Sequence, residues 1–304
     1  MQPPILLGFL PFLATAVSAE CTREFLIDAT DKYLAAQITG AGNDFATALA
    51  ADDITYTENW VPLNIAEGVL SEPIVIDHNR SIHDTVRCAT FTEIIAASNP
   101  HPYVIGTRIV FNSSSSPPEN NKISLMESIV TDDGDWAFNA TGYLYWDSLE
   151  AWDAIPEDLR DARDAVLQAA GDAYFDRFAD AGVAVPFGTP CARLEGGAST
   201  APLDPTGDSC TAAGMPSALV VTDRRYVVDE LLGAVDIYVG FPGLDRSQAQ
   251  DPMPDSHLFR VEAGEIRYIH TVSACVEDGC GMDGEGPPPP PPPSRKRTRR
   301  SGRG

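Results

Sequence analysis

The sequence predicts an α+β protein made of two tandem units, each with one helix packed in a curved antiparallel sheet. Apolar residues recur at helical spacing over residues 22–38 and again over residues 166–178, as in amphipathic helices. Each segment is followed by short stretches in which β-branched and aromatic residues alternate with polar ones, the pattern of half-buried strands. A helix that precedes a run of antiparallel strands is typical of the α+β class.

The two predicted helices open the two units. The first is expected to start after Thr22, whose hydroxyl can cap it, and its apolar stripe includes Tyr33. The second carries a similar stripe that includes Tyr174 and Phe178. Strands are predicted over residues 54–59, 89–95, 104–111, 123–131 and 136–141 in the first unit. In the second unit they are predicted over residues 192–195, 226–231, 234–241, 257–262 and 265–273.

Matching residues at a nearly constant offset indicate that the second unit repeats the first. The offset falls from 141 positions at the helices to 137 in the strands and 130 at the last turns, as loop deletions after a tandem duplication would make it. The matched pairs are Tyr33 with Tyr174, Glu58 with Glu195, Glu93 with Glu230, and residues 133–134 with residues 263–264. We therefore place the first unit at residues 20–150 and the second at residues 151–286.

The segment between the units and the two chain ends have their own patterns. Apolar residues at a spacing of three predict a packed connecting helix, and they are Trp146, Leu149, Trp152 and Ile155. Residues 1–19 hold a short apolar stretch that ends in small residues, the pattern of a cleaved secretory signal. An even number of cysteines, six, suits an oxidising compartment, and the sequons at Asn79, Asn112 and Asn139 predict N-linked glycans. We therefore expect a secreted, extracellular glycoprotein.

Residues 287–304 form a proline-rich, basic tail. Seven consecutive prolines predict a stiff polyproline II rod, and six Lys and Arg residues follow it. This charge opposes that of the whole chain, which has 44 acidic and 21 basic residues and a formal net charge of -23. The tail could be a disordered, solvated extension, an anchor on an anionic cell wall or lipid surface, or a segment that binds the acidic body. The acidic surface argues against nucleic acid as a partner, and no stretch after residue 19 is apolar enough to span a membrane.

Two sets of segments resemble known proteins. Residues 258–266 (LFRVEAGEI) resemble the last hairpin of the nuclear-transport-factor-like cone fold, and residues 51–59 (ADDITYTEN) resemble its first helix-to-strand passage. That superfamily includes ketosteroid isomerase, scytalone dehydratase and the polyketide cyclases. Residues 188–197 and 224–230 are similar to an uncharacterised family of secreted fungal proteins, and this resemblance covers most of the body. The resemblances imply two tandem cone-like units, each with a pocket inside its curved sheet.

The predicted hairpin around Ala263 and Gly264 defines the candidate site. A two-residue turn fixes the register of a hairpin, so His257 is expected to face His270, with both imidazoles on one apolar face. The same counting around residues 133–134 makes Glu127 the counterpart of His257 in the first unit. Burial shifts the pKa of an imidazole or a carboxyl, which suits these groups for proton transfer.

The catalytic candidates all lie in the second unit. They are His257, His270, Glu230 and Tyr268. One histidine would accept and return a proton, while Arg193 or Tyr268 would stabilise an enolate-like oxygen. The ligand-binding candidates are Arg193, Glu195, Tyr56, Glu58, Glu93, Arg108 and Glu127. Structural ion pairs, such as Glu58 with Arg108 or Glu195 with Arg193, would explain the same charges without any chemistry.

The cysteines and glycines point to structure and not to cofactors. The duplication predicts the disulfides Cys21–Cys88, Cys191–Cys210 and Cys275–Cys280. Residues 279–284 match the G-x-G-x-x-G pattern but precede polyproline and no helix, so we expect no nucleotide cofactor. The chain has no His-Glu-x-x-His or paired Cys-x-x-Cys spacing, so we expect no metal.

The sequence thus leaves two functions open. One is a secreted protein that binds a small, largely apolar molecule in the pocket of the second unit, with acid–base isomerase, cyclase or dehydratase activity. The other is a non-catalytic extracellular binding protein or a cell-wall-associated interaction protein. An open pocket with convergent polar groups favours the first, and a filled interior with an exposed apolar patch favours the second.

Overall fold

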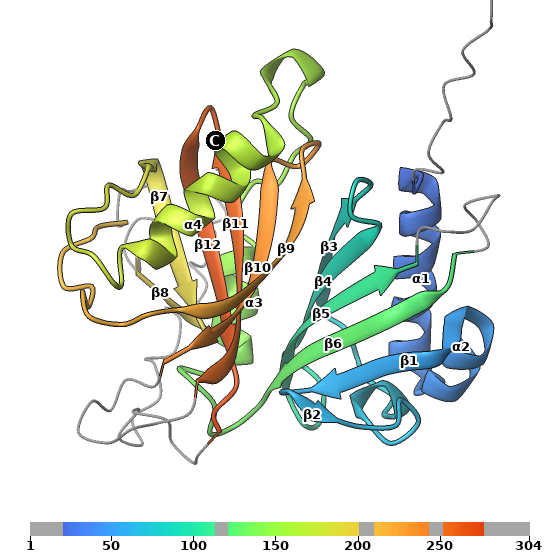
Figure 1. The fold of residues 1–304 in the computed structure, drawn as a ribbon. Helices are drawn as coiled ribbons and strands as arrows, with labels where there is room; N and C mark the ends of the chain where they lie inside the picture. The colour runs from blue at the N-terminus through green and yellow to red at the C-terminus, as the bar shows by residue number, and fades with distance from the viewer. Residues whose placement is uncertain (1–20, 113–120, 201–209, 243–251, 277–304) are drawn as a thin grey trace, which may run out of the picture.

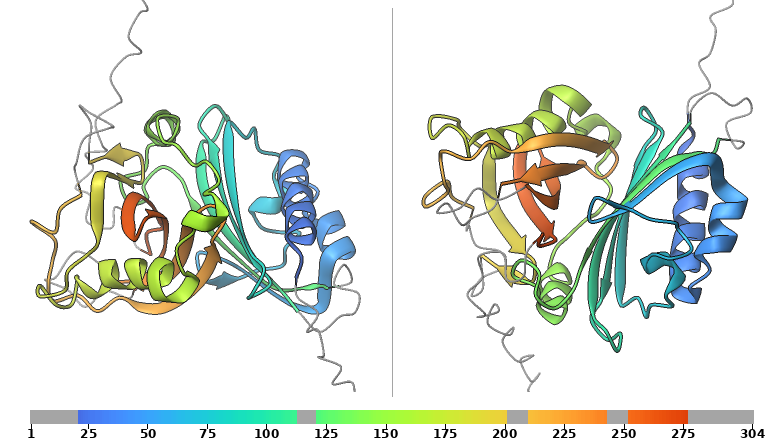
Figure 2. Two further views of the ribbon diagram at one scale, coloured as in Figure 1. Left: turned by 90° about the horizontal axis from the view of Figure 1, so that it is seen from above. Right: turned by 60° about the horizontal axis from the view of Figure 1, so that its bottom comes forward.

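The computed structural model describes residues 21–112, 121–200, 210–242 and 252–276. Two six-stranded sheets pack face to face, and helix α1 (Arg23–Thr39) covers the outer face of one while α4 (Ala169–Asp176) covers the outer face of the other (Figure 1). The same order of layers is visible from above and from below (Figure 2). This arrangement confirms an α+β protein.

The two sheets have the same strand order. The first sheet contains β1 (Ala50–Glu58), β2 (Val61–Pro62), β3 (His78–Asp84), β4 (Ala89–Ala96), β5 (Tyr103–Phe111) and β6 (Ile123–Thr131), in the order β2-β1-β6-β5-β4-β3. The second sheet contains β7 (Phe187–Glu195), β8 (Ala198–Ser199), β9 (Thr222–Asp229), β10 (Ala234–Phe241), β11 (Met253–Glu262) and β12 (Glu265–Ser273), in the order β8-β7-β12-β11-β10-β9. One parallel pair, β1 with β6 or β7 with β12, occupies the same place in each sheet. The chain therefore consists of two tandem, sheet-rich units.

Helices form at both predicted positions. Thr22 caps α1, because its hydroxyl accepts a hydrogen bond of 3.2 Å from the backbone N–H of Phe25. The second predicted helix forms as a π-helical segment, η4 (Arg163–Gln168), that continues into α4. The remaining helical segments are α2 (Gly42–Leu49), η1 (Val69–Ser71), α3 (Ala140–Asp147) and η3 (Glu157–Leu159).

The sequence-based strand assignments are confirmed except in one place. Residues 136–141 do not form a strand, because Asn139 caps α3 by accepting a hydrogen bond of 2.9 Å from the backbone N–H of Gly142. The predicted connecting helix ends early, since α3 stops at Asp147 and Trp152 follows in irregular chain. Strand β3 was not predicted, although it forms one edge of the first sheet.

Three apolar cores hold the layers together. One lies between α1 and the first sheet, and a second lies between α4 and the second sheet. The third joins the facing sides of the two sheets and includes Phe91 and Ile95 from the first unit with Leu258 and Val272 from the second. Burial of this shared core stabilises the docking of the units, because apolar surface on both sheets is removed from water.

Two buried aspartates reinforce the docking where β3 and β9 lie side by side. Asp84 accepts a hydrogen bond of 3.0 Å from the backbone N–H of Val228, and Asp229 accepts one of 2.9 Å from that of His83. Each carboxylate also meets an arginine of the other unit, since Arg163 pairs with Asp84 and Arg23 pairs with Asp229 at 2.7 Å. The contacts are reciprocal, so the two units meet about an approximate two-fold relation.

Two of the predicted disulfides, Cys21–Cys88 and Cys191–Cys210, are present, and both are consistent with an oxidising compartment. The third involves Cys280, which lies outside the described residues, as do the predicted signal at residues 1–19 and the tail at residues 287–304. Among the sequon asparagines, Asn79 is exposed, whereas Asn112 and Asn139 are half-buried. Within the described ranges, no helix combines the length and apolarity that crossing a membrane requires.

Candidate functional site

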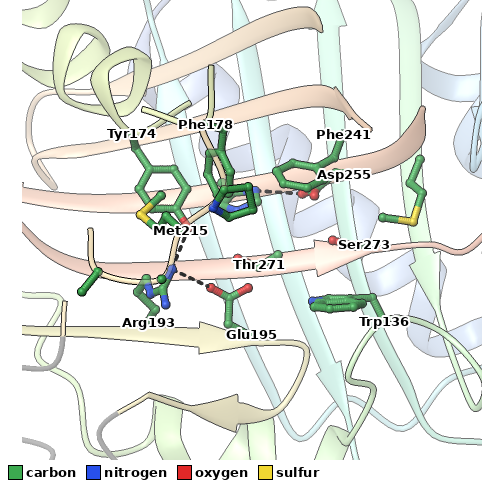
Figure 3. Close-up of a pocket in the computed structure, with 15 residues that line it drawn as sticks. Trp136, Tyr174, Phe178, Arg193, Glu195, Met215, Phe241, Asp255, Thr271 and Ser273 are labelled. Carbon is green, nitrogen blue, oxygen red and sulfur yellow. Dashed lines mark hydrogen bonds and ion pairs between the residues drawn. The ribbon is translucent and has the colours of Figure 1, made fainter. Parts of the chain in front are cut away.

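A cavity of about 350 Å³ lies in the second unit, between α4 and the sheet. Figure 3 shows the 15 residues that line it. They are Trp136, Tyr174, Phe178, Arg193, Glu195, Ala213, Gly214, Met215, Pro216, Phe241, Met253, Asp255, His257, Thr271 and Ser273. A concave, mostly apolar space with a few convergent polar groups is the usual form of a small-molecule site.

The polar end of the cavity follows from the two-residue period of the strands. Asp255 and His257 alternate on β11, and Thr271 is the partner of His257 on the neighbouring strand β12. Glu195 of β7 is in turn the partner of Thr271, so Glu195, Thr271 and His257 form one row across the sheet. Arg193 lies two residues before Glu195 and therefore points to the same face.

The carboxylate of Asp255 lies against the imidazole of His257. Its Oδ1 lies 2.8 Å from Nδ1 of His257, and both side chains are nearly fully buried. The imidazole packs against Phe175 and Tyr174 of α4, with ring centroids 4.9 Å and 5.5 Å away. The Oδ1 and Nδ1 atoms lie at ion-pair distance but not in hydrogen-bond geometry. A carboxylate beside Nδ1 leaves the other ring nitrogen, Nε2, for a ligand.

A second polar group forms around Arg193. Its guanidinium donates a hydrogen bond of 3.3 Å to the hydroxyl of Tyr174 and lies 3.7 Å from the carboxylate of Glu195 (Figure 3). Burial raises the pKa of Tyr174, and the nearby Glu195 adds to that effect, so the phenol keeps its proton and can donate it to a ligand. Four buried polar atoms of the lining have no hydrogen-bond partner among the described residues, and they are Nε of Arg193, Oγ1 of Thr271, Oδ1 of Asp255 and Nδ1 of His257.

The rest of the lining is largely apolar. Its larger side chains come from the turn after α4, from the paired ends of β10 and β11, and from the segments before α3 and β9, and they are Phe178, Phe241, Met253, Trp136 and Met215. The segment at residues 211–216 is fixed in place because Arg177 donates to the carbonyl oxygens of Ala212 and Pro216 at 3.2 Å and 3.4 Å. The disulfide Cys191–Cys210 ties the start of this segment to β7.

The structure corrects the expected pairing of the two histidines. The turn at Ala263 and Gly264 forms as predicted, but the register shifts by one residue between Arg260 and Val261. His257 therefore faces Thr271, whereas His270 faces Leu258. A one-residue shift moves side chains to the other face of a strand, so the prediction that both imidazoles share one face is wrong.

His270 belongs instead to a buried ionic cluster between the two sheets. Its Nδ1 lies 3.0 Å from Oε1 of Glu93 in the first unit, and its Nε2 lies 2.7 Å from Oε2 of Glu150. Glu93 also accepts a hydrogen bond of 2.6 Å from the hydroxyl of Tyr143 and pairs with Arg80 at 2.9 Å. Burial alone would lower the pKa of His270, but the two carboxylates outweigh burial and raise this pKa to about 10.

One group of metal-ligand type occurs within the described ranges, and it lies in this cluster. Glu93, Asp147 and His270 offer ligand atoms within 4.8 Å of one another. Arg80 already pairs with both carboxylates, at 2.9 Å and 2.5 Å. A buried guanidinium supplies the positive charge that a cation would otherwise bring, so the cluster fits a structural role.

The other two catalytic candidates also lie outside the cavity. Tyr268 is half-buried on the face of β12 that carries His270, and it packs near Trp152 with ring centroids 5.8 Å apart. Glu230 lies in the turn between β9 and β10. The predicted equivalence of Glu230 with Glu93 is wrong, because the strand pairing places Tyr238 where the first unit has Glu93.

The candidates of the first unit divide between two faces. Tyr56 and Glu58 point toward α1, as predicted, and the hydroxyl of Tyr56 donates to the carboxylate of Glu58. Arg108 is not their partner, because it lies on the other face of the sheet and pairs with Glu127 at 2.5 Å. Glu127 is also not the counterpart of His257, since the strand pairing places Thr107 at the equivalent position. The predicted hairpin around residues 133–134 does not form, because β6 ends at Thr131.

Sequence reasoning identified part of the cavity and missed part of it. His257, Arg193 and Glu195 were candidates, and all three line the cavity. Asp255 was missed, although its position two residues before a histidine in a strand places both on one face. Tyr174 was assigned only to the helix core. Trp136 and Met215 come from irregular segments, for which periodicity gives no signal.

Comparison with known proteins adds one match. A model of a domain of unknown function, DUF8021, matches residues 160–273. This span contains α4 and the strands β7 to β12, and it includes the cavity residues from Tyr174 to Ser273. No curated protein matches the chain significantly.

Proposed function

We propose that the second unit binds a small, largely apolar molecule whose polar end meets His257, Arg193 and Thr271. The observation that carries this proposal is the open cavity of about 350 Å³, in which buried polar atoms lack partners while aromatic and methionine side chains form the remaining wall. Unpartnered buried polar groups cost about 1–3 kcal/mol each, and a ligand would satisfy them. A helix that covers a sheet over a pocket also supports the cone-like fold of the resemblance, and a secreted protein suits the disulfides.

The polar end can support acid–base chemistry. His257, with the carboxylate of Asp255 beside it, would remove a proton from a carbon next to a carbonyl group, and the electron pair would move onto the carbonyl oxygen. Donors from Arg193, Tyr174 or Thr271 would stabilise that negative oxygen. The protonated His257 would then return the proton to another carbon, which gives isomerisation, or to a leaving hydroxyl group, which gives dehydration.

The non-catalytic alternative shares this cavity and differs in the use of His257. A binding protein would keep its ligand unchanged, and binding would need only the shape and the donors of the cavity. Contact of the tail with a cell wall or an anionic surface stays a prediction.

Native mass spectrometry of the secreted chain tests the proposal, because a ligand bound in a cavity of this kind survives gentle desolvation as added mass. Tyr174→Phe removes the hydroxyl that meets Arg193, so we expect loss of the added mass at unchanged fold. Tyr33→Phe is the matched control, since Tyr33 occupies the equivalent helix position and its hydroxyl bonds Thr107 at 2.8 Å inside a filled core. Equal retention by both variants would contradict the proposal.

Catalysis is tested separately with His257→Gln. This variant should retain the ligand but release it chemically unchanged, whereas the unaltered chain should yield an isomer or a dehydrated product. If the wild-type chain also leaves the ligand unchanged, the protein binds without catalysis.

A further inference from the structure

A second cavity, of about 220 Å³, lies at the junction of the two units and is separate from the pocket of the second unit. Its lining comes from both units: Thr57, Trp60 and Glu127 from the first, and Asp223 and Arg225 from the second. Strand β1 runs toward the second unit and ends in the turn that carries Trp60 (Figure 1). Trp60 reaches the second sheet there, since its ring lies within 3.1 Å of the position that a Cβ on Gly240 would take.

Trp60 adopts a backbone conformation that is unfavourable for its side chain. Asn59 and Trp60 form the two-residue turn between β1 and β2, with φ angles of 47° and 66°. Turns of this kind favour glycine at the second position, and the equivalent turn between β7 and β8 consists of Gly196 and Gly197. A bulky residue in the left-handed region costs roughly 1–3 kcal/mol. Because glycine would avoid this strain, we infer that the indole side chain makes contacts in the cavity that a glycine could not make.

A second backbone irregularity places Asp223 in the same cavity. Asp223 also has a positive φ, 54°, and it lies where the pairing of β9 with β10 shifts register between Tyr238 and Gly240. Bulges of this type redirect a side chain and recur beside functional sites. Two of the five residues that line the cavity therefore carry left-handed backbone without being glycine.

One of the two carboxylates in this cavity is paired with arginines, and the other is exposed. Glu127 is paired with Arg108 at 2.5 Å and with Nε of Arg225 at 3.2 Å. The carboxylate of Asp223 is exposed, and the single hydrogen bond found for it within the described residues comes from the hydroxyl of Thr222 at 3.3 Å. The lining thus offers an aromatic ring, one available carboxylate, a guanidinium and a hydroxyl, and its charges are balanced once Arg108, the partner of Glu127, is counted.

We propose that this junction cavity binds one pyranose ring of a neutral polysaccharide. A pyranose has an apolar face of C–H groups that packs on an indole, and it has adjacent hydroxyls that donate to a carboxylate and accept from a guanidinium. Hydrogen bonds to charged groups are stronger than neutral ones, which suits Asp223 and Arg225. A cationic ligand fits less well, because Arg225 borders the space and balances one of the two acidic residues.

The test uses the intact chain and four soluble tetrasaccharides, namely cellotetraose, chitotetraose, laminaritetraose and mannotetraose. Saturation-transfer NMR detects weak binding, and titration by tryptophan fluorescence measures it. We expect at least one tetrasaccharide to bind, Trp60→Gly to weaken that binding tenfold or more, and Asp223→Asn to weaken it severalfold. Asparagine tolerates the left-handed conformation, so Asp223→Asn changes the charge and leaves the bulge intact.

Two further variants separate recognition from packing. Ala263→Gly is the matched control, because Ala263 also has a left-handed backbone, with φ 54°, and lies outside both cavities; it should bind like the wild type. Trp60→Phe keeps an aromatic ring against the second sheet, so it replaces Trp60→Gly if that variant does not fold. It should still bind the tetrasaccharide more weakly than the wild type does. Absence of binding to all four sugars, or equal binding by wild type and both Trp60 variants, would overturn the proposal.

Discussion

The two units share one backbone plan, but one is filled and the other is open. In each, the middle of the sheet carries a row of residues that faces the covering helix. The row in the first unit is Glu58, Ser128, Thr107, Thr92 and Ser81, and the row in the second unit is Glu195, Thr271, His257, Ile237 and Tyr226. The helices add an equivalent tyrosine to each, Tyr33 or Tyr174.

The first unit satisfies its row internally. Thr107 bonds Tyr33 at 2.8 Å and Ser128 at 2.9 Å, so the hydroxyls form a continuous chain. Glu58 accepts from the backbone N–H of Val69, which holds the η1 segment over the sheet, and the side chains of Val69 and Leu70 join the core. The polar groups of this row that face Tyr33 and the η1 segment are therefore paired within the chain.

The second unit keeps the positions and changes the chemistry. A histidine replaces Thr107, and an arginine replaces Tyr56. The same fold therefore serves as a structural unit where its inward-facing polar groups are paired within the chain, and as a candidate binding site where they are not.

The largest effect is expected from breaking the ionic cluster that joins the units. His270→Gln should lower the free energy of unfolding by about 3–5 kcal/mol, because Glu150 loses its imidazolium partner and the buried Glu93 keeps only Arg80 as an ionic partner. Within the part of the chain that the structure describes, the second unit has no such ionic cluster at the matching position, where Tyr238 takes the place of Glu93 and donates to the backbone oxygens of Gly106 at 2.6 Å and Glu127 at 3.1 Å. Urea unfolding of the wild type and of His270→Gln measures the loss of stability.

The pH dependence of this cluster has a definite sign. Burial would raise the pKa of Glu93, but His270 and Arg80 outweigh it and lower this pKa from 4.5 to about 2. The pKa of His270 rises from 6.5 to about 10. The stabilisation is therefore complete between about pH 4.5 and 6.5, declines as the pH rises toward 10, and declines as the pH falls toward 2. A gap between wild type and His270→Gln that stays constant from pH 6 to 10 would contradict this assignment.

The next effect contrasts the two glutamates of the rows. Glu58→Gln should cost about 1–3 kcal/mol of stability, because Glu58 accepts from both Tyr56 and the η1 backbone. Glu195→Gln should cost less, since the side chain of Glu195 is 22% exposed and its partner Arg193 lies 3.7 Å away. Thermal unfolding of the two variants, side by side, decides whether the first unit is the structural one; equal losses would not fit.

A buried aspartate gives a smaller effect of opposite direction. Asp236 is fully buried, and burial raises its pKa well above 3.8. Among the described residues, Ser256 is the one donor to its carboxylate, at 2.6 Å. The folded state therefore holds Asp236 protonated, and stability is lost as the pH rises above the pKa of the unfolded chain. Asp236→Asn should raise stability at pH 7 by about 1–2 kcal/mol and have no effect near pH 3. Unfolding at both pH values checks this.

The sequence was sufficient for the units and for part of the site. Period-two strands, a capped helix start and the Tyr33–Tyr174 match depend on local patterns, and local patterns survive in the fold. The face of His270 could not be predicted in this way, because a single bulge near Arg260 reverses it. The alignment of Glu93 with Glu230 failed for a related reason: the offset between units changes from strand to strand, and only pairing reveals it.

The smallest expected effect also gives the most direct comparison of filled and open units. Thr107→Val removes the hydroxyl that bonds both Tyr33 and Ser128. The free energy of unfolding should therefore fall by about 1–2 kcal/mol. Thr271→Val removes a buried hydroxyl that has no partner among the described residues, so it should be neutral or slightly stabilising in the ligand-free protein. The same substitution should weaken ligand binding if Thr271 serves the pocket. Chemical unfolding of both variants measures the difference in stability, and native mass spectrometry measures ligand retention by Thr271→Val. An equal loss of stability in the two variants would mean that Thr271 is hydrogen-bonded as fully as Thr107.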